Sequence, residues 1–200
     1  MKKSKLALWI MVPALILACK NNNTEGDAEK VSEKEIVVEK KEEASPVKDV
    51  VQVTVQMEAK SESGAMGMIM FTQVASVVKM EGKIGNLSEG THAIHLHEKA
   101  DCSSADGKSS GGHWNPTFQD HGAWGAESGF HLGDIGNFEV DAEGVGKIQF
   151  STDLWCIGCG DEKRDILGKA VIVHQGTDDL SSQPSGAAGA RIACGGVIGK

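Results

Sequence analysis

The chain has 200 residues, which allows one well-packed domain with accessory segments or at most two small domains. Acidic residues outnumber basic ones by 28 to 20, a formal net charge of −8, and this balance disfavours a nucleic-acid partner, whose phosphates need a basic face. Glycine is frequent, with 25 residues, which favours turns over helices, and the absence of tyrosine excludes tyrosyl chemistry.

The first nineteen residues have the pattern of an export signal. Three lysines precede an apolar run over residues 6–18, which is too short for an ordinary transmembrane helix and fits a signal-peptide core. The run ends Leu17-Ala18-Cys19, which resembles a bacterial lipoprotein signal that is cleaved before Cys19 and carries lipid on its sulfur. Residues 1–19 are therefore predicted to be a lipoprotein signal peptide, with an ordinary secretory signal cleaved nearby as the alternative.

A charged segment follows over residues 20–49, with six Lys against nine Asp and Glu. It is too polar to bury a face, so we expect a disordered tether between the lipid and a domain over residues 50–200. Because a bacterial lipoprotein carries several lipid chains, membrane attachment would be stable. The protein is thus expected in the bacterial cell envelope, with its domain facing the periplasm or the exterior.

From residue 50 the chain alternates apolar and polar residues between glycine-rich turns, which is the period of half-buried strands. We expect an all-β fold, an eight-stranded antiparallel sandwich or barrel. Two long loops interrupt the pattern, and long loops in a compact domain usually carry function. The predicted strands cover residues 51–57, 67–73, 76–84, 91–97, 137–140, 147–150, 169–173 and 191–198, and the loops cover residues 98–136 and 175–190.

All seven histidines lie in this domain, and six of them bound or lie in the first long loop. His95 and His97 are two residues apart on a predicted strand, so their rings point the same way and would supply half of a planar nitrogen set for copper(II). His174 ends a later strand. His92 is expected to be an ordinary strand histidine that bonds nearby backbone.

Three more histidines and a carboxylate fall inside the first loop, at His113, His121, His131 and Asp134. Three nitrogens and one carboxylate held by a folded loop suit tetrahedral zinc. A lone histidine is more often an ordinary surface or core residue than a metal ligand. Here, however, chance would have to cluster all of these histidines independently. The conjunction therefore predicts a metal centre.

Seven segments, in order and near the expected spacings, resemble the copper/zinc superoxide dismutases. The resemblance covers roughly residues 50–200 and implies a Greek-key arrangement of the eight strands. The segments are HAIHLH (92–97), GHWNP (112–116), HG (121–122), HLGDIGN (131–137), VIVH (171–174), DDL (178–180) and GARIACG (189–195).

The resemblance implies copper and zinc as cofactors, in two ligand sets that share one histidine bridging the metals as imidazolate. Copper would be held by His95, His97, His113 and His174, and zinc by His113, His121, His131 and Asp134.

Asp178 resembles the aspartate that joins a copper ligand, His95, to a zinc ligand, His121, and fixes the orientation of both rings. Without the resemblance, a surface acid beside Asp179 would be an adequate explanation of this residue.

The family's reaction is the dismutation of superoxide to dioxygen and hydrogen peroxide. Arg191 would lie beside copper and bind superoxide, because an arginine stays charged and presents several donors in a fork. His113 would take up a proton when copper is reduced and so hold the local charge constant. Ser185 would narrow access to copper.

The segment over residues 178–191 contains no lysine, unlike the better-known members of the family. Attraction of superoxide must therefore come from elsewhere, and Lys99, Lys108 and Lys163 are the candidates.

The resemblance also pairs Cys102 with Cys194, which would tie the first long loop to the last strand. Cys156 and Cys159 are extra and form a Cys-x-x-Cys sequence. In a β domain outside the cytosol a small structural disulfide is expected there, with a copper-loading or redox role as the alternative.

Two other functions stay open besides a superoxide dismutase. One is a metal-binding lipoprotein without catalysis, and the other is an adhesion or structural lipoprotein that uses the fold as a scaffold. The complete ligand set and Arg191 favour the enzyme. Both a monomer and a homodimer are compatible with the sequence.

Overall fold

The computed structural model describes residues 49–199, which form eight strands and one short 3₁₀ helix, η1 (Lys108–Ser110). The predicted strands are all present, with bounds that shift by a few residues. The predicted signal peptide, Cys19 and residues 20–48 of the predicted tether lie outside the described residues. The strands are β1 (Val50–Ala59), β2 (Met66–Val74), β3 (Val77–Gly85), β4 (Gly90–His97), β5 (Gly136–Val140), β6 (Gly146–Thr152), β7 (Ala170–His174) and β8 (Arg191–Gly196).

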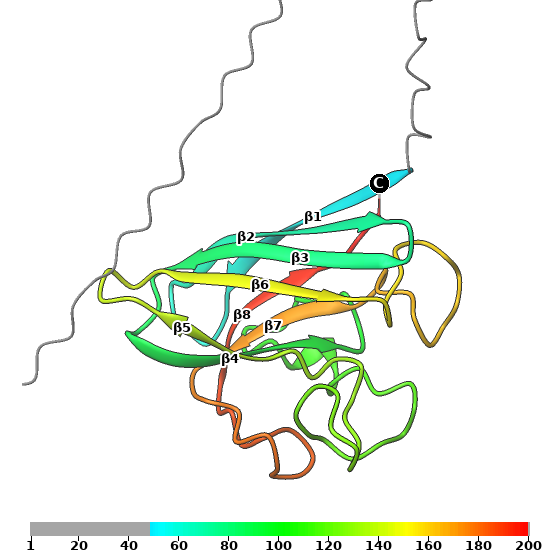
Figure 1. Ribbon diagram of the computed structural model, residues 1–200. Coiled ribbons are helices and arrows are strands. Elements are labelled where there is room, and N and C mark those ends of the chain that lie inside the picture. The colour runs from blue at the N-terminus through cyan, green and yellow to red at the C-terminus, as the bar shows by residue number, and fades with distance from the viewer. Residues whose placement is uncertain (1–48, 200) are drawn as a thin grey trace, which may run out of the picture. The chain divides into compact units, whose positions relative to one another are not determined.

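The eight strands close into an antiparallel barrel in the order β1-β2-β3-β6-β5-β4-β7-β8 (Figure 1). β3 lies beside β6, and β4 lies beside β7. The connection from β3 to β4 and the connection from β6 to β7 therefore each pass over two strands, in the Greek-key manner. The predicted all-β Greek-key fold is confirmed. Closure pairs every strand on both sides and leaves no free sheet edge.

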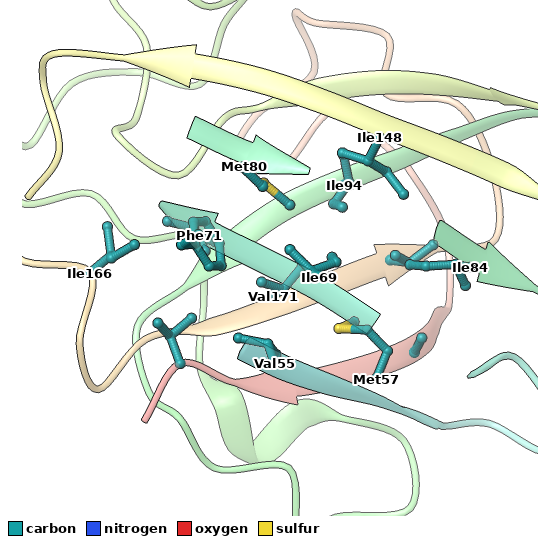
Figure 2. Packing of buried hydrophobic residues seen from close by; sticks show 14 of the residues in the cluster. Val55, Met57, Ile69, Phe71, Met80, Ile84, Ile94, Ile148, Ile166 and Val171 are labelled. Atoms are coloured by element: carbon teal, nitrogen blue, oxygen red, sulfur yellow. The ribbon is translucent and has the colours of Figure 1, made fainter. Parts of the chain in front are cut away.

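The barrel interior is filled by alternate residues of the strands, as a period of two requires (Figure 2). Val55 on β1 pairs with Ile69 on β2, and both are buried in the core with Phe71 and Met80. Burying an aliphatic or aromatic side chain of this size stabilises the fold by about 1.5–3 kcal/mol. The core therefore makes the barrel wall a rigid support for whatever its outer face carries.

Three long connections join the strands, one more than the sequence predicts. Residues 98–135 and 175–190 are the predicted loops, and Figure 1 shows them beyond β4 in green to yellow-green and in orange. The third, residues 153–169, contains Trp155, whose buried indole N–H donates to the carbonyl oxygen of Leu132 at 2.9 Å. This bond ties the third connection to the first loop. Within residues 49–199 no helix is long and apolar enough to cross a membrane.

Candidate metal centre

The centre begins on the outer face of β4. Ile94 and Leu96 point into the barrel core, so the alternating residues His95 and His97 project from the other side. In the ladder His95 lies opposite Ile172 of β7 and His97 lies opposite Ala170. His174 follows on that same face of β7.

Backbone hydrogen bonds attach the first long loop to β4 and bring the histidines of the loop over this face. The backbone N–H of Trp114 donates to the carbonyl of Leu96 at 2.8 Å, and the N–H of Leu96 donates to the carbonyl of Gly133 at 2.9 Å. Gly133 lies so close that a Cβ there would meet the Leu96 carbonyl oxygen. These contacts fix the position of His113, which precedes Trp114, and of Asp134, which follows Gly133, over the strand.

Four buried histidines bring one ring nitrogen each to within 4.8 Å of one another: His95, His97, His113 and His174. Within the described part of the chain, Nδ1 of His95 and Nε2 of the other three are buried without a hydrogen-bond partner. Leaving a buried polar atom unpaired costs about 1–3 kcal/mol. Four such nitrogens at one point fit a metal ion, and a set of four imidazoles suits copper.

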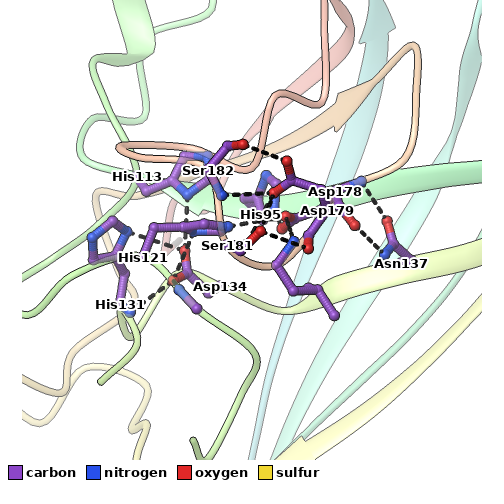
Figure 3. A network of polar contacts seen from close by, with 12 residues as sticks. His95, His113, His121, His131, Asp134, Asn137, Asp178, Asp179, Ser181 and Ser182 are labelled. Carbon is purple, nitrogen blue, oxygen red and sulfur yellow. Dashed lines mark hydrogen bonds and ion pairs between the residues drawn. The ribbon is translucent and has the colours of Figure 1, made fainter. Parts of the chain in front are cut away.

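A second buried group consists of His113, His121, His131 and Asp134 (Figure 3). The Asp134 carboxylate lies 2.8 Å from Nδ1 of His113, 3.0 Å from Nδ1 of His121 and 3.1 Å from Nδ1 of His131. Ligand atoms around a tetrahedral zinc are about 3.3 Å apart, given bonds of about 2.0–2.1 Å. One ring nitrogen from each histidine and one carboxylate oxygen, all within 4.8 Å of one another, therefore fit zinc.

His113 belongs to both groups. Its Nδ1 faces Asp134, whereas its Nε2 belongs to the group with His95, and the rings of His113 and His95 have centroids 4.0 Å apart. The structure thus brings together all seven predicted ligand residues. His92, predicted to be outside the centre, has Nδ1 2.8 Å from the His174 carbonyl oxygen and Nε2 2.9 Å from that of Ser88.

Asp178 lies between the two groups, as predicted, and is fully buried (Figure 3). Its Oδ2 is 2.8 Å from Nε2 of His95, and its Oδ1 is 2.9 Å from Nε2 of His121. Since each of these rings has its other nitrogen in a ligand group, the carboxylate sets which nitrogen carries the proton.

Two amide side chains that support the centre were not predicted from the sequence. Asn137 donates to the Asp178 carbonyl at 2.9 Å and accepts from the Asp178 N–H at 2.8 Å. Gln183 pairs in the same two-way manner with the backbone of His121. Both join segments about 40 to 60 residues apart in the chain, and local patterns carry no signal for such a contact.

Burial and neighbouring charges set the protonation of these groups. Burial lowers the pKa of His174 to about 3 and that of His113 to about 4, the second against the opposing effect of Asp134. Burial and the nearby His113 also lower the pKa of His97 well below its usual value. These rings are therefore neutral at pH 7, the state in which imidazole binds a metal.

The two carboxylates are ionised. Burial acts to raise the pKa of Asp178, but hydrogen bonds from His95, Leu180 and His121 outweigh it and lower the pKa to about 2. Bonds from His113 and His131 likewise outweigh burial at Asp134 and hold its pKa far below the usual range. An ionised Asp134 is a competent zinc ligand.

A cleft of about 590 Å³ opens onto the first group, and its lining includes His97, His113, His174 and Arg191. Arg191 donates through Nη1 to the Gly107 carbonyl at 2.9 Å and to Oγ of the buried Ser110 at 3.1 Å. Arg191 thus lines the same cleft as three histidines of the first group, which is the position expected from the sequence. Ser110 was not predicted to have any part in it.

A β-bulge aims Arg191 into the cleft. Val173 pairs with Ala193, but the next residue, His174, pairs with Arg191, so Ile192 is an extra residue on β8. Ile192 and Ala193 accordingly both face the core. With regular alternation Arg191 would point inward with Ala193, and the bulge turns it outward.

The lining of the cleft has mixed charge. Of the three lysines suggested by the sequence, Lys108 lines the cleft and Lys99 and Lys163 do not. Asp106 also lines it, with a carboxylate oxygen 3.0 Å from Nζ of Lys108. Ser185 is part of the lining, as expected for a residue that narrows access.

Both expected disulfides are present. Cys102–Cys194 joins the first loop to β8 with Cα atoms 5.8 Å apart, and Cys156–Cys159 closes a short turn in the third connection with Cα atoms 6.0 Å apart. The first bond lies against Ala170 and Ile172 on the outer face of β7. It therefore anchors the loop close to Arg191.

Comparisons with known proteins agree with this geometry. The family model for copper/zinc superoxide dismutase matches residues 65–198. An extracellular Cu-Zn superoxide dismutase of Caenorhabditis elegans is 37% identical over 147 residues, which cover 68% of this chain and 64% of that protein. One from Haemonchus contortus is 36% identical over 140 residues, which cover 67% of this chain and 73% of that protein.

Solved structures share the fold. The crystal structure of a SOD-like protein from Bacillus subtilis has a TM-score of 0.65 and 30% identity, covering 72% of this chain and 97% of that chain. A double mutant of such a protein, with a tyrosine and a proline each replaced by histidine, has a TM-score of 0.65 and 32% identity, covering 73% and 97%.

Proposed function

Because the chain belongs to the copper/zinc superoxide dismutase family, we propose that it dismutes superoxide to dioxygen and hydrogen peroxide. The observation that carries the proposal is the pair of buried ligand groups beside a cleft that also contains Arg191. An adhesion or structural protein would have no use for four buried imidazole nitrogens that meet at one point without hydrogen-bond partners in the described residues.

We assign the two groups to different metals by their donor sets. Bound copper would supply one-electron chemistry, and zinc, which has no redox chemistry, would supply structure and charge. Copper would be held by His95, His97, His113 and His174, and zinc by His113, His121, His131 and Asp134.

The residues around the cleft bind the substrate and handle protons. Arg191, whose guanidinium stays charged, attracts and orients the superoxide anion. Nε2 of His113 is the atom at which a proton is held when that nitrogen is not coordinated. Asp178 keeps the rings of His95 and His121 in one tautomer and orientation, and Ser185 restricts the cleft to small molecules.

Metal content and activity measured on the same sample test the proposal. We expect one copper and one zinc per chain and dismutation that a copper chelator abolishes. Arg191→Ala should lower kcat/KM about 10- to 100-fold, the worth of a charge-assisted hydrogen bond, without metal loss. Arg164→Ala is the matched control, since among the described hydrogen bonds the side chain of Arg164 donates only to the carbonyls of Asp153 and Leu154.

The alternative of a metal-binding protein without catalysis makes a distinct prediction. It requires both metals to bind stoichiometrically while dismutation stays at the rate of free copper, and Arg191→Ala would then change nothing. That outcome would overturn the enzymatic proposal.

We also propose that residues 1–19 are a lipoprotein signal peptide, that Cys19 carries the lipid and that residues 20–49 tether the domain to the cell envelope. The sequence pattern supports this, as do the two disulfides, which persist in oxidising compartments. Both relatives are named extracellular enzymes. The mass of the mature N-terminus from the membrane fraction tests it, and Cys19→Ser should abolish lipid attachment.

A further inference from the structure

Three methionines form a row on the outside of the barrel. Met66, Met68 and Met70 alternate along β2 with Gly67 and Ile69, and Ile69 is fully buried in the core. The methionines therefore project outward, with 59%, 51% and 36% of their surface exposed. We call these three residues the methionine strip.

Composition alone does not explain the strip. The chain has seven methionines, and three of them fall within residues 66–70. Exposed strand positions favour β-branched and aromatic residues rather than methionine. An exposed strand with three thioethers on one face therefore calls for a chemical explanation.

The neighbours of the strip leave its sulfur atoms accessible. Met68 lies between Gln56 of β1 and Lys83 of β3, and Nε2 of Gln56 donates to its sulfur at 3.6 Å. Met70 lies opposite Glu81, whose charge offsets that of Lys83, and Met66 lies opposite Gly85, which has no side chain. A shallow hollow lined by all three methionines runs along the face.

The spacing allows more than one sulfur to reach the same ion. Alternate residues of a strand are about 6.6 Å apart, because the rise is about 3.3 Å per residue. Methionine is unbranched with three rotatable bonds, so neighbouring side chains can converge. Thioether sulfur is a neutral, soft donor, and among the biological metals such donors select Cu(I) over zinc, calcium and magnesium.

We propose that Met66, Met68 and Met70 form a surface site for a soft monovalent cation, Cu(I), that is separate from the histidine centre. β2 and β4 are separated by three strands in either direction around the barrel, so the two sites lie on opposite walls. The inference rests on the thioethers alone and does not depend on the dismutase activity.

Silver(I), which has the same soft character and does not change oxidation state, is the probe. Purified protein with its histidine sites already filled by copper and zinc is titrated with silver, and the methyl signals of methionine are followed by NMR. We expect one equivalent to shift the signals of Met66, Met68 and Met70. The fully buried Met80, which does not line the hollow, is the internal control, and its signal should not move.

The variant with Met66, Met68 and Met70 all replaced by leucine keeps the apolar surface and removes the sulfur. It should lose the extra equivalent of silver, and of Cu(I) in competition with a chromophoric chelator, with its thermal unfolding and dismutase rate unchanged. Equal binding by wild type and variant, or the absence of any shift at the three methionines, would overturn the proposal. A shift at Met80 as well would also overturn it, because it would mean that silver disrupts the core.

Discussion

At the scale of single residues, the Asp178 carboxylate depends on the glycine that lies against it. Gly186 has φ +65°, and a Cβ there would meet Oδ1 of Asp178 and lie 2.7 Å from Nε2 of His121. The space that a side chain would need is the space occupied by the hydrogen bond between those two residues. Asp178 and Gly186 therefore function as one unit.

Gly186→Ala should displace Asp178 and release the ring of His121. We expect zinc affinity to fall about 10- to 100-fold, as for other changes to the groups that orient metal ligands. Competition with a chelator measures it. Gly160→Ala is the control, since Gly160 also has a positive φ, +74°, but no described residue lies within 4 Å of its added Cβ. A similar loss of zinc affinity in both variants would mean that backbone strain, not Asp178, is responsible.

Arg191 is held by a residue from another element. Ser110→Ala removes one of its two hydrogen-bond acceptors, and the Gly107 carbonyl remains. Because a bond to a charged group contributes about 1.5–3 kcal/mol, of which part is retained, kcat/KM for superoxide should fall about 3- to 10-fold at unchanged metal content. Ser109→Ala, at a neighbouring serine that bonds Ser104 and Asp101 instead, should leave the rate unchanged. A loss of metal in Ser110→Ala would contradict a role limited to Arg191.

At the scale of elements, β4 and β8 show what a sequence can and cannot predict. The alternation of Ile94 and Leu96 with His95 and His97 indicates which face each residue takes, and the structure confirms it. Residues 191–198 are mostly small and apolar without alternation, so nothing local marks the bulge at Ile192. Which way Arg191 points is decided by pairing with β7.

The same distinction holds for the loops. Loop positions follow from gaps in the strand pattern, and the candidate ligands follow from their side-chain chemistry. The links made by Asn137, Gln183 and Ser110 join distant segments, so they depend on tertiary structure. The sequence did not predict that residues 153–169 form a third long connection. The apolar Trp155 and Ile157 belong to the core, as residues of a strand would.

The two disulfides should differ in what they contribute. Cys102–Cys194 spans 92 residues and Cys156–Cys159 spans 3, so loop-closure entropy predicts losses of about 4–5 and about 2 kcal/mol when each pair is replaced by serine. Urea unfolding of the two double variants measures the difference. The first should also lower activity, since the loop that holds Arg191 loses its anchor. Equal losses of stability would refute the entropic explanation.

At the scale of the whole molecule, folding of the metal-free protein favours the neutral form of three histidines of the centre and the ionised form of its carboxylates, and this links stability to pH. In the folded protein His97, His113 and His174 have lowered pKa values, whereas in the unfolded chain the same rings have the usual histidine pKa of about 6.5. Between those limits the unfolded state holds more protons, so their contribution to stability is complete above pH 6.5 and is lost as the pH falls. Asp134 and Asp178, with lowered pKa values, act in the same direction below pH 3.8.

His121 opposes this trend. Burial acts to lower its pKa, but the hydrogen bond to Asp178 and the charge of Asp134 outweigh burial and raise it. Its contribution is therefore complete below pH 6.5 and is lost as the pH rises through the folded-state pKa. The two effects occupy different pH ranges, because His121 acts above pH 6.5 and the three rings with lowered pKa values act below it, so acidification below pH 6.5 causes a net loss of stability.

The metal-free protein should therefore lose stability as the pH falls from about 6.5 to about 4, by up to about 1.4 kcal/mol per pH unit for each of the three rings with a lowered pKa. The loaded protein should keep its stability until protons displace the metals, because coordination holds the same rings in their neutral form. Urea unfolding of both forms at a series of pH values measures the two curves. Parallel curves would show that the histidines do not control acid stability. Curves that diverge as the pH falls below 6.5 would attribute the difference to the ligand rings with lowered pKa values.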